Sequence, residues 1–209
     1  MKNFFSHDPK LLLYGFLIVF FASYGQTFFI SLFNTDIRNF YDLSDGEFGF
    51  VYAISTLFSS FILISFAKLI DHIDLRTYSL IVTIGLLLAC FGMVMLVNHV
   101  LYLFVIIFML RFFGQGAMTH AGETTMARYF GNNRGKALSV ATLGGMAGVM
   151  FLPYITLNYF KNIEMSQLWF YTCISIIFFI PFIFLALSDQ KARHNKFDEA
   201  LKNDPLNLK

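Results

Sequence analysis

The chain has 209 residues, of which 57% are hydrophobic and only 13% are charged, and its mean hydropathy is +0.64. Soluble domains carry about 25% charged residues, so this composition excludes a soluble globular domain and indicates a membrane protein. The formal net charge of +2 is too small, and the basic residues are too dispersed, for a nucleic-acid-binding protein.

Six apolar runs follow one another along residues 1–187, and a polar tail occupies residues 188–209. Each run has about the 20 residues that a helix needs to cross a hydrocarbon core of about 30 Å. The predicted spans are residues 11–33, 48–67, 78–97, 101–121, 137–157 and 167–187. The first run continues to Phe33, which makes it too long for the apolar core of a cleaved signal peptide. The pattern predicts an all-α, polytopic membrane protein.

The distribution of Lys and Arg predicts how these spans are oriented. If the N-terminus is cytoplasmic, twelve basic residues fall in cytoplasmic segments and only two, Arg38 and Lys161, fall outside. Cytoplasmic loops carry the excess of Lys and Arg, so we expect both termini to be cytoplasmic. The expected location is the inner or plasma membrane of the cell. The remaining basic residue, Arg111, lies inside a span.

Arg111 lies about ten residues from either end of the fourth span, near the expected midplane of the bilayer. A central arginine costs about 2.5–3.5 kcal/mol on insertion scales, which indicates a polar cavity, a partner or a substrate. Its planar fork matches a carboxylate or a phosphate, so we interpret it as the group that binds an anionic substrate. The alternative is a structural arginine satisfied by carbonyl groups or by Gln115 and Tyr24.

Polar residues follow Arg111 at intervals of one helical turn, and others gather near the middle of the first span. These two faces predict a polar cavity, although a lone polar residue in a span also serves as a helix-to-helix contact. The predicted substrate-binding residues are Arg111, Gln115, Gln26, Tyr24 and Thr119. His120 and Glu123, nearer the cytoplasmic mouth, are candidates for proton coupling; alternatively, Glu123 is simply solvated.

The fifth span carries small residues on one face. Gly144, Gly145 and Gly148 allow another helix to approach closely, and Pro153 introduces a bend.

An internal repeat relates the two halves of the chain. A shift of 89 positions places residues 24–27 over 113–116, and Ser55 and Ser59 over Gly144 and Gly148. The loop after the first copy is acidic and its counterpart is basic, as expected if the two lie on opposite sides of the membrane. The repeat predicts a 3+3 inverted arrangement.

Three motifs together resemble helices four and five of a major facilitator superfamily transporter. They are Arg-x-x-Gly-Gln-Gly at 111–116, Arg-Gly-Lys-Ala at 134–137, and Gly-x-x-x-Gly at 144–148 with Pro153 beyond. The loop at 67–76 is similar to the cytoplasmic motif between helices two and three of that family. It keeps Asp71 and Arg76, but its glycine positions and two basic positions hold other residues. Val149 stands where antiporter versions of the fifth-helix motif have proline, which weakens an antiporter assignment.

The resemblance implies the N-terminal six-helix half of a transporter that moves a small polar, anionic solute by alternating access. In the family, spans one and four line the central cavity, and the aspartate and arginine equivalent to Asp71 and Arg76 latch the cytoplasmic gate. The alternatives are an ordinary charged turn at this loop and, for the whole chain, a non-transporting membrane assembly or sensor module.

The sequence contains no phosphate-binding loop, no clustered metal ligands and no nucleophile paired with a base, so we expect neither an enzyme nor a cofactor or metal. The expected partners are the substrate, the lipid bilayer and a second six-helix half, but no nucleic acid. That half belongs to a longer chain, to a separate polypeptide or to a second copy in a homodimer, in that order of preference. We do not expect the chain to transport as a monomer.

Overall fold

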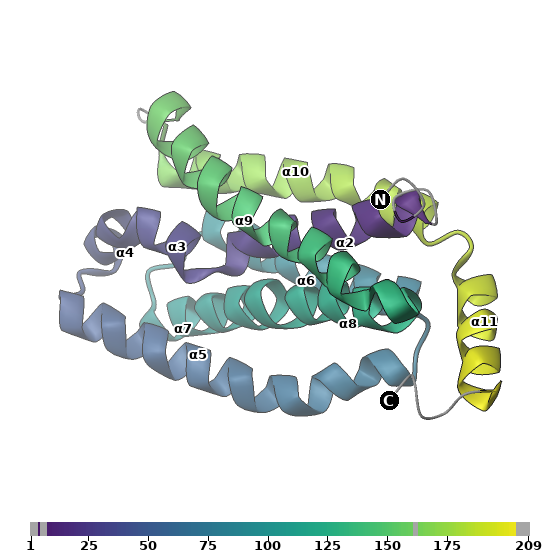
Figure 1. Ribbon diagram of the computed structural model, residues 1–209. Coiled ribbons are helices and arrows are strands. Elements are labelled where there is room, and N and C mark those ends of the chain that lie inside the picture. The colour runs from purple at the N-terminus through teal and green to yellow at the C-terminus, as the bar shows by residue number, and fades with distance from the viewer. Residues whose placement is uncertain (1–3, 5–7, 161–162, 204–209) are drawn as a thin grey trace.

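The computed structural model describes residues 4, 8–160 and 163–203, which form helices and connecting turns without a strand. The long helices run side by side along the bundle (Figure 1). They are α2 (Pro9–Ala22), α5 (Asp45–Ala67), α6 (Leu75–Val94), α7 (Val100–Met109) continued by the π-helix η4 (Leu110–Met118) and α8 (Thr119–Tyr129), α9 (Arg134–Tyr159) and α10 (Met165–Ala186). The shorter elements are η1 (Ser23–Gly25), α3 (Thr27–Ile30), η2 (Ser31–Phe33), α4 (Asn34–Tyr41), η3 (Lys68–Asp71), η5 (Gly131–Asn133) and α11 (Gln190–Asn203).

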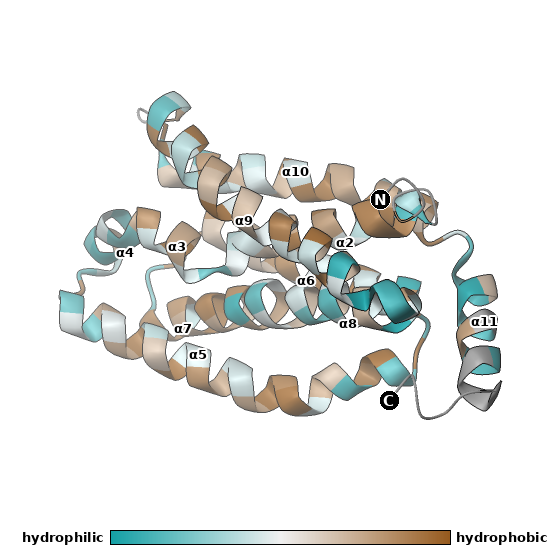
Figure 2. Ribbon diagram, in the orientation of Figure 1, coloured by the Kyte–Doolittle hydropathy of each residue, from teal (hydrophilic) through white to brown (hydrophobic). Residues whose placement is uncertain are grey.

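Length and composition make five of these helices able to cross a membrane. A sixth span results if Pro9–Gly25 and Thr27–Tyr41, which meet at a 44° bend, count as one. The predicted all-α polytopic fold is therefore confirmed. Figure 2 shows the hydrophobic residues along the long helices and the hydrophilic ones gathered on α4, α11 and the turns. Large apolar side chains such as Phe61 and Met150 are mostly exposed, as expected of surfaces that face lipid.

Several helices begin where a side chain caps the first turn. Asp8 accepts a hydrogen bond from the backbone N–H of Leu11 at 3.1 Å, ahead of the proline that opens α2. Ser44 accepts from the N–H of Glu47 at 3.3 Å, and the Glu47 carboxylate accepts from the N–H of Ser44 at 2.9 Å, which completes a capping box on α5. Such caps satisfy backbone donors that have no partner inside the helix.

The first span is broken rather than continuous, which the hydropathy of residues 11–33 did not predict. Between η1 and α3, Gln26 takes an extended backbone conformation with φ −83° and ψ 153°. Irregular backbone at membrane depth is tolerated where it is buried in protein or lines a cavity, because its carbonyl groups need partners there. The break therefore marks a place where the first span meets polar groups.

The helix contacts follow the predicted repeat. In this arrangement α2 of the first half packs against α9 of the second half, and the equivalent contact joins η4 and α7 of the second half to α5 of the first. The third and sixth spans, α6 and α10, pack against each other. Gly25 and Gly114, equivalent under the 89-residue shift, are also in contact, since a Cβ on Gly114 would lie 2.7 Å from Cα of Gly25. A pseudo-twofold axis through this point would bring equivalent residues together in this way.

Helix α11 lies across one end of the bundle (Figure 1). Arg193 on this helix donates to both carboxylate oxygens of Asp8, at 2.6 and 3.1 Å, and to the backbone oxygen of Ala186 at 3.1 Å. The predicted polar tail is thus helical over 190–203 and is held against the start of α2. We call this end, with the turns after η3, α8 and α10, the α11 end, and the opposite end the α4 end.

Candidate functional site

Arg111 lies in the π-helix that interrupts the fourth span. It is 7% exposed, although it is charged and stands among apolar neighbours. π-Helical turns are rare and are frequently found at functional sites. The fourth span thus departs from regular α-helix at Arg111, and the first span departs from it at Gln26, next to the residues that Arg111 contacts.

One terminal nitrogen of Arg111 makes both of its hydrogen bonds with the described residues. Its Nη1 donates to the backbone oxygen of Gly25 at 3.4 Å and to Oγ1 of Thr27 at 3.0 Å. Both acceptors belong to the broken part of the first span. The alternative of a structural arginine named carbonyl groups or the side chains of Gln115 and Tyr24 as acceptors. A carbonyl group does accept from Arg111, whereas neither Gln115 nor Tyr24 does.

Tyr52 on α5 completes the contacts around this guanidinium. Its ring centroid lies 5.4 Å from Cζ of Arg111, and its hydroxyl donates to Oγ1 of Thr27 at 2.9 Å. A cation over an aromatic ring is attracted by the ring quadrupole. Tyr52 and Thr27 together hold the Nη1 side of Arg111 in one orientation.

The opposite edge of Arg111 makes no hydrogen bond with the described residues. The buried Nε has no hydrogen-bond partner, and within the described part of the chain no carboxylate forms an ion pair with this arginine. A buried charge without a partner is costly, and a buried donor left unsatisfied adds about 1–3 kcal/mol. This edge carries the pair of N–H groups, on Nε and Nη2, that matches a carboxylate.

A pocket of about 250 Å³ opens beside Arg111, between α5 and the fourth span. Two of its hydroxyl groups, Thr56 Oγ1 and Thr119 Oγ1, are also buried without a partner. The pocket is lined by Thr56, Ser59, Ser60, Leu63, Arg111, Gln115, Gly116, Thr119, His120 and Glu123. Three residues that line this pocket therefore each hold a buried polar atom without a hydrogen-bond partner among the described residues, which favours a polar occupant.

The predicted site residues are brought together only in part. Every one that lies on the fourth span lines the pocket with Arg111: Gln115, Thr119, His120 and Glu123. Tyr24 instead hydrogen-bonds to Ser175 of α10 at 3.0 Å, and Gln26 caps α3 outside the pocket lining. The side chain of His120 contacts Thr124 at 3.4 Å, and Glu123 is exposed. Their role in proton coupling stays a prediction.

Sequence reasoning missed the contribution of the second span. Tyr52, Thr56 and Ser60 come from α5, where they follow one another at intervals of four residues in a mainly apolar run. That spacing was a usable signal, because polar residues at intervals of four occupy one helix face.

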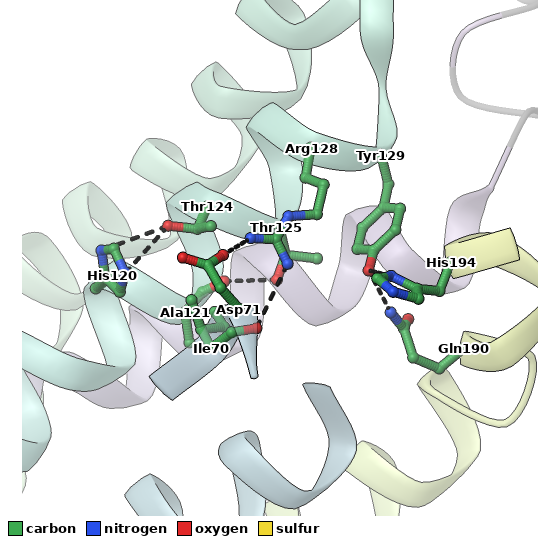
Figure 3. A network of polar contacts seen from close by, with 10 residues as sticks. All are labelled: Ile70, Asp71, His120, Ala121, Thr124, Thr125, Arg128, Tyr129, Gln190 and His194. Atoms are coloured by element: carbon green, nitrogen blue, oxygen red, sulfur yellow. Dashed lines mark hydrogen bonds and ion pairs between the residues drawn. The ribbon is translucent and has the colours of Figure 1, made fainter. Parts of the chain in front are cut away.

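Polar contacts also join the helices at the α11 end (Figure 3). Arg128 forms an ion pair with Asp71 and donates to the backbone oxygen of Ile70 at 3.5 Å. Arg76 donates to the backbone oxygen of Leu187 at 2.8 Å, and so ties α6 to the end of α10. The two motif residues Asp71 and Arg76 therefore each hold a different neighbour, and the aspartate pairs with an arginine from the fourth span.

The predicted packing glycines lie where α9 crosses α2. A Cβ on Gly144 would overlap the backbone oxygen of Phe16, and one on Gly148 would overlap Oγ of Ser23. At Gly145 the nearest atom would be a methyl carbon of Val19 at 3.3 Å. Pro153 lies within α9, which continues past it to Tyr159.

The family model of the Major Facilitator Superfamily matches residues 15–208. The chain belongs to this superfamily. No curated protein and no solved structure matches it in the other two comparisons. The match covers five of the predicted spans completely and the first from residue 15 onward, and a chain of this length fits one six-helix half.

Members of the superfamily are membrane transporters rather than enzymes. This confirms two predictions: the chain is a multi-pass membrane protein, and it belongs to a class of proteins that transport solutes across membranes. Its pocket lies between the second and fourth spans, and the ion pair Asp71–Arg128 lies at the α11 end of the same two spans.

Proposed function

We propose that this chain moves a small anionic solute across the membrane and that Arg111 binds the anion. The observation that carries the proposal is the buried guanidinium, whose Nη1 is held by two acceptors and whose Nε has no partner among the described residues. A structural arginine would be expected to place its donors on protein acceptors. Here the edge best suited to a carboxylate lacks one, beside a pocket that is large enough for a small solute.

We further propose that transport proceeds by alternating access, with Asp71–Arg128 as a latch at the α11 end. The side chains of Arg128 and Asp71 are 19% and 57% exposed. Ion pairs exposed to this degree contribute about 0–1 kcal/mol, so the pair can break and form again in each cycle. Arg76 supports the same end by its bond to Leu187 rather than by pairing with Asp71.

Uptake into vesicles tests the proposal. Vesicles from cells that express the chain with its natural partners are given labelled lactate and gluconate as anions, and labelled glucitol and choline as neutral and cationic solutes. We expect uptake of at least one anion and of neither other solute.

Arg111→Lys keeps the charge but loses the fork, so uptake of the anion should fall by about 10-fold or more, since a charge-assisted hydrogen bond is worth about 1.5–3 kcal/mol. Arg134→Lys is the matched control, because Arg134 is exposed at the start of α9 and lies outside the pocket. Anion uptake that is unchanged in Arg111→Gln, or uptake restricted to neutral or cationic solutes, would contradict the proposal. An absence of flux for all solutes would favour a non-transporting module.

A further inference from the structure

The pocket beside Arg111 offers more neutral hydrogen-bonding groups than binding an anionic charge requires. Five of its ten lining residues have neutral hydroxyl or amide side chains. Leu63 is the one lining residue with an apolar side chain, since Gly116 has none. Pockets that bind simple organic acids by their hydrocarbon part are lined mainly by apolar and aromatic residues. This lining therefore fits a solute whose carbon chain is itself polar.

The hydroxyl and amide groups of the residues that line the pocket can both donate and accept hydrogen bonds. Oγ1 of Thr56 and of Thr119 have no partner, and the Gln115 side chain makes no hydrogen bond within the described residues. Ser59 and Ser60 donate to the backbone oxygen of Thr56, at 2.8 and 2.9 Å, and so keep their oxygen lone pairs as acceptors. A hydroxyl group on a solute has one donor and two lone pairs, and is complementary to this mixture.

The charges in the lining favour a single negative charge on the solute. Arg111 and Glu123 are the only Arg, Lys, Asp or Glu residues among the ten, and they lie on the fourth span with Gln115 and Thr119 between them. One guanidinium edge matches one carboxylate. A dianionic phosphate would bring a second negative charge into a lining that has a carboxylate of its own.

From these groups we infer that the solute is a hydroxylated monocarboxylate, an inference that rests on the proposed function of Arg111. The carboxylate binds the Nε edge of Arg111, and the hydroxyl groups of the carbon chain contact Gln115, Thr119 and the hydroxyls of α5. Gln115 and Thr119 follow Arg111 by about one and two helical turns on the same pocket wall. A solute that reaches Thr119 has a chain of several carbons.

Binding measurements on the native complex, isolated from its own membranes through a tag on this chain, test the inference. Isothermal titration uses four probes: gluconate, hexanoate, glucitol and sn-glycerol 3-phosphate. Gluconate and hexanoate have the same number of carbons and the same carboxylate, and differ in their hydroxyl groups. We expect gluconate to bind about 10-fold or more tightly than hexanoate, because each hydrogen bond to a buried partner contributes about 0.5–1.5 kcal/mol. Glucitol and glycerol phosphate should bind more weakly than gluconate.

Thr119→Val removes one unpartnered hydroxyl while keeping the shape of the side chain. Gluconate affinity should fall by about 3-fold or more, and hexanoate affinity should stay the same or rise, because the buried hydroxyl no longer goes unsatisfied. Thr77→Val is the matched control, since Thr77 is exposed near the start of α6 and does not line the pocket.

The outcomes separate the two levels of the proposal. If gluconate and hexanoate bind alike and both are lost in Arg111→Gln, Arg111 binds anions and the hydroxylated substrate class is wrong. Tighter binding of glycerol phosphate than of gluconate also overturns that class and leaves an anion site. If Arg111→Gln changes the binding of none of the probes, the proposed function itself is overturned.

Discussion

Arg111 derives its orientation from residues that reach it from two other spans. The break in the first span provides the Gly25 carbonyl and the Thr27 hydroxyl, and α5 provides the Tyr52 ring. Gly25 and Gly114 make this meeting possible, because a side chain on either would strike the backbone of the other. The edge that we propose to bind the anion is thus held in place by contacts that the anion itself would not use.

We predict that Tyr52 positions Arg111 by two separable contacts. Tyr52→Phe keeps the ring over Cζ and loses the hydrogen bond to Thr27, so anion affinity should fall by about 2-fold to 10-fold, the range that one hydrogen bond of about 0.5–1.5 kcal/mol implies. Tyr52→Leu loses both contacts and should weaken binding further, by the additional 0.5–2 kcal/mol or so of a cation–π contact. The measurement is the Kd of the transported anion.

The matched pair for these variants is Tyr154→Phe and Tyr154→Leu, since Tyr154 is 57% exposed on α9. These substitutions should leave Kd unchanged. Equal losses in Tyr52→Phe and Tyr52→Leu would show that the ring plays no part in positioning Arg111.

At the scale of elements, the crossing of α2 and α9 depends on individual glycines. We predict that Gly144→Ala destabilises the chain by about 1–3 kcal/mol, the usual cost of overpacking, because the new methyl group meets a backbone oxygen that cannot rotate away. Gly145→Ala, one position along the same helix, meets only a Val19 methyl group at 3.3 Å and should cost much less. Denaturant unfolding in detergent, followed by the fluorescence of the single Trp169, compares the two. A similar loss of stability in both variants would show that α9 does not pack on α2 through Gly144.

Hydropathy predicted the spans because each is a long apolar run, and the glycine motif predicted which face of α9 packs closely. The break at Gln26 was beyond this reasoning, because no proline marks it and the apolar residues on both sides of the polar stretch 23–27 together have the length of one span. The π-helix could not be predicted either, since an apolar run does not show which hydrogen-bonding register its helix takes; Gly114, which lies against Gly25, is within this π-helix.

The candidate site was predictable where the signal lies within one span, and not where it depends on contacts between spans. A charged residue inside a span identified Arg111, and helical spacing identified Gln115 and Thr119, since both signals are local. The pairing of Asp71 with Arg128 joins residues far apart in the sequence, and motif similarity favoured Arg76 instead. Tyr24 was assigned to the cavity as part of the polar face of the first span, but its hydroxyl hydrogen-bonds to Ser175 of α10 instead.

For the whole molecule, the loops that were assigned to the cytoplasm all lie at the α11 end (Figure 1). We predict from the positive-inside bias that this end is cytoplasmic. Asn39 on α4 and Asn133 in η5 lie at opposite ends and are both exposed. In intact cells a membrane-impermeant thiol reagent should label Asn39→Cys and should not label Asn133→Cys until the membrane is opened. Both native cysteines are buried and give little background. Labelling of Asn133→Cys alone in intact cells would reverse the topology.

The pocket beside Arg111 borders the surface of the six-helix bundle. Ser60 and Glu123 in its lining are exposed on the surface of the six-helix bundle, next to the buried Arg111. In a bilayer these groups would face lipid, where ionisable side chains are costly and normally face a bundle interior or a water-filled cavity. Alternating access in such transporters moves one helix bundle against another around a site at their interface. We therefore propose that a second six-helix bundle covers this face.

The last prediction is that the chain carries out transport only when this face is covered. Ser60→Cys and Glu123→Cys should each cross-link, with a short bifunctional thiol reagent, to whatever bundle lies opposite, whereas Asn39→Cys should not, because it lies at the α4 end outside the pocket. The mass of the product distinguishes a second copy of this chain from a different polypeptide or from another part of the same chain. Purified as a proven monomer and reconstituted alone, the 209-residue chain should give no Arg111-dependent flux. Anion flux from that monomer at the rate of the native complex would show that the polar face needs no partner, and that the pocket lined by α5 and the fourth span forms a complete path.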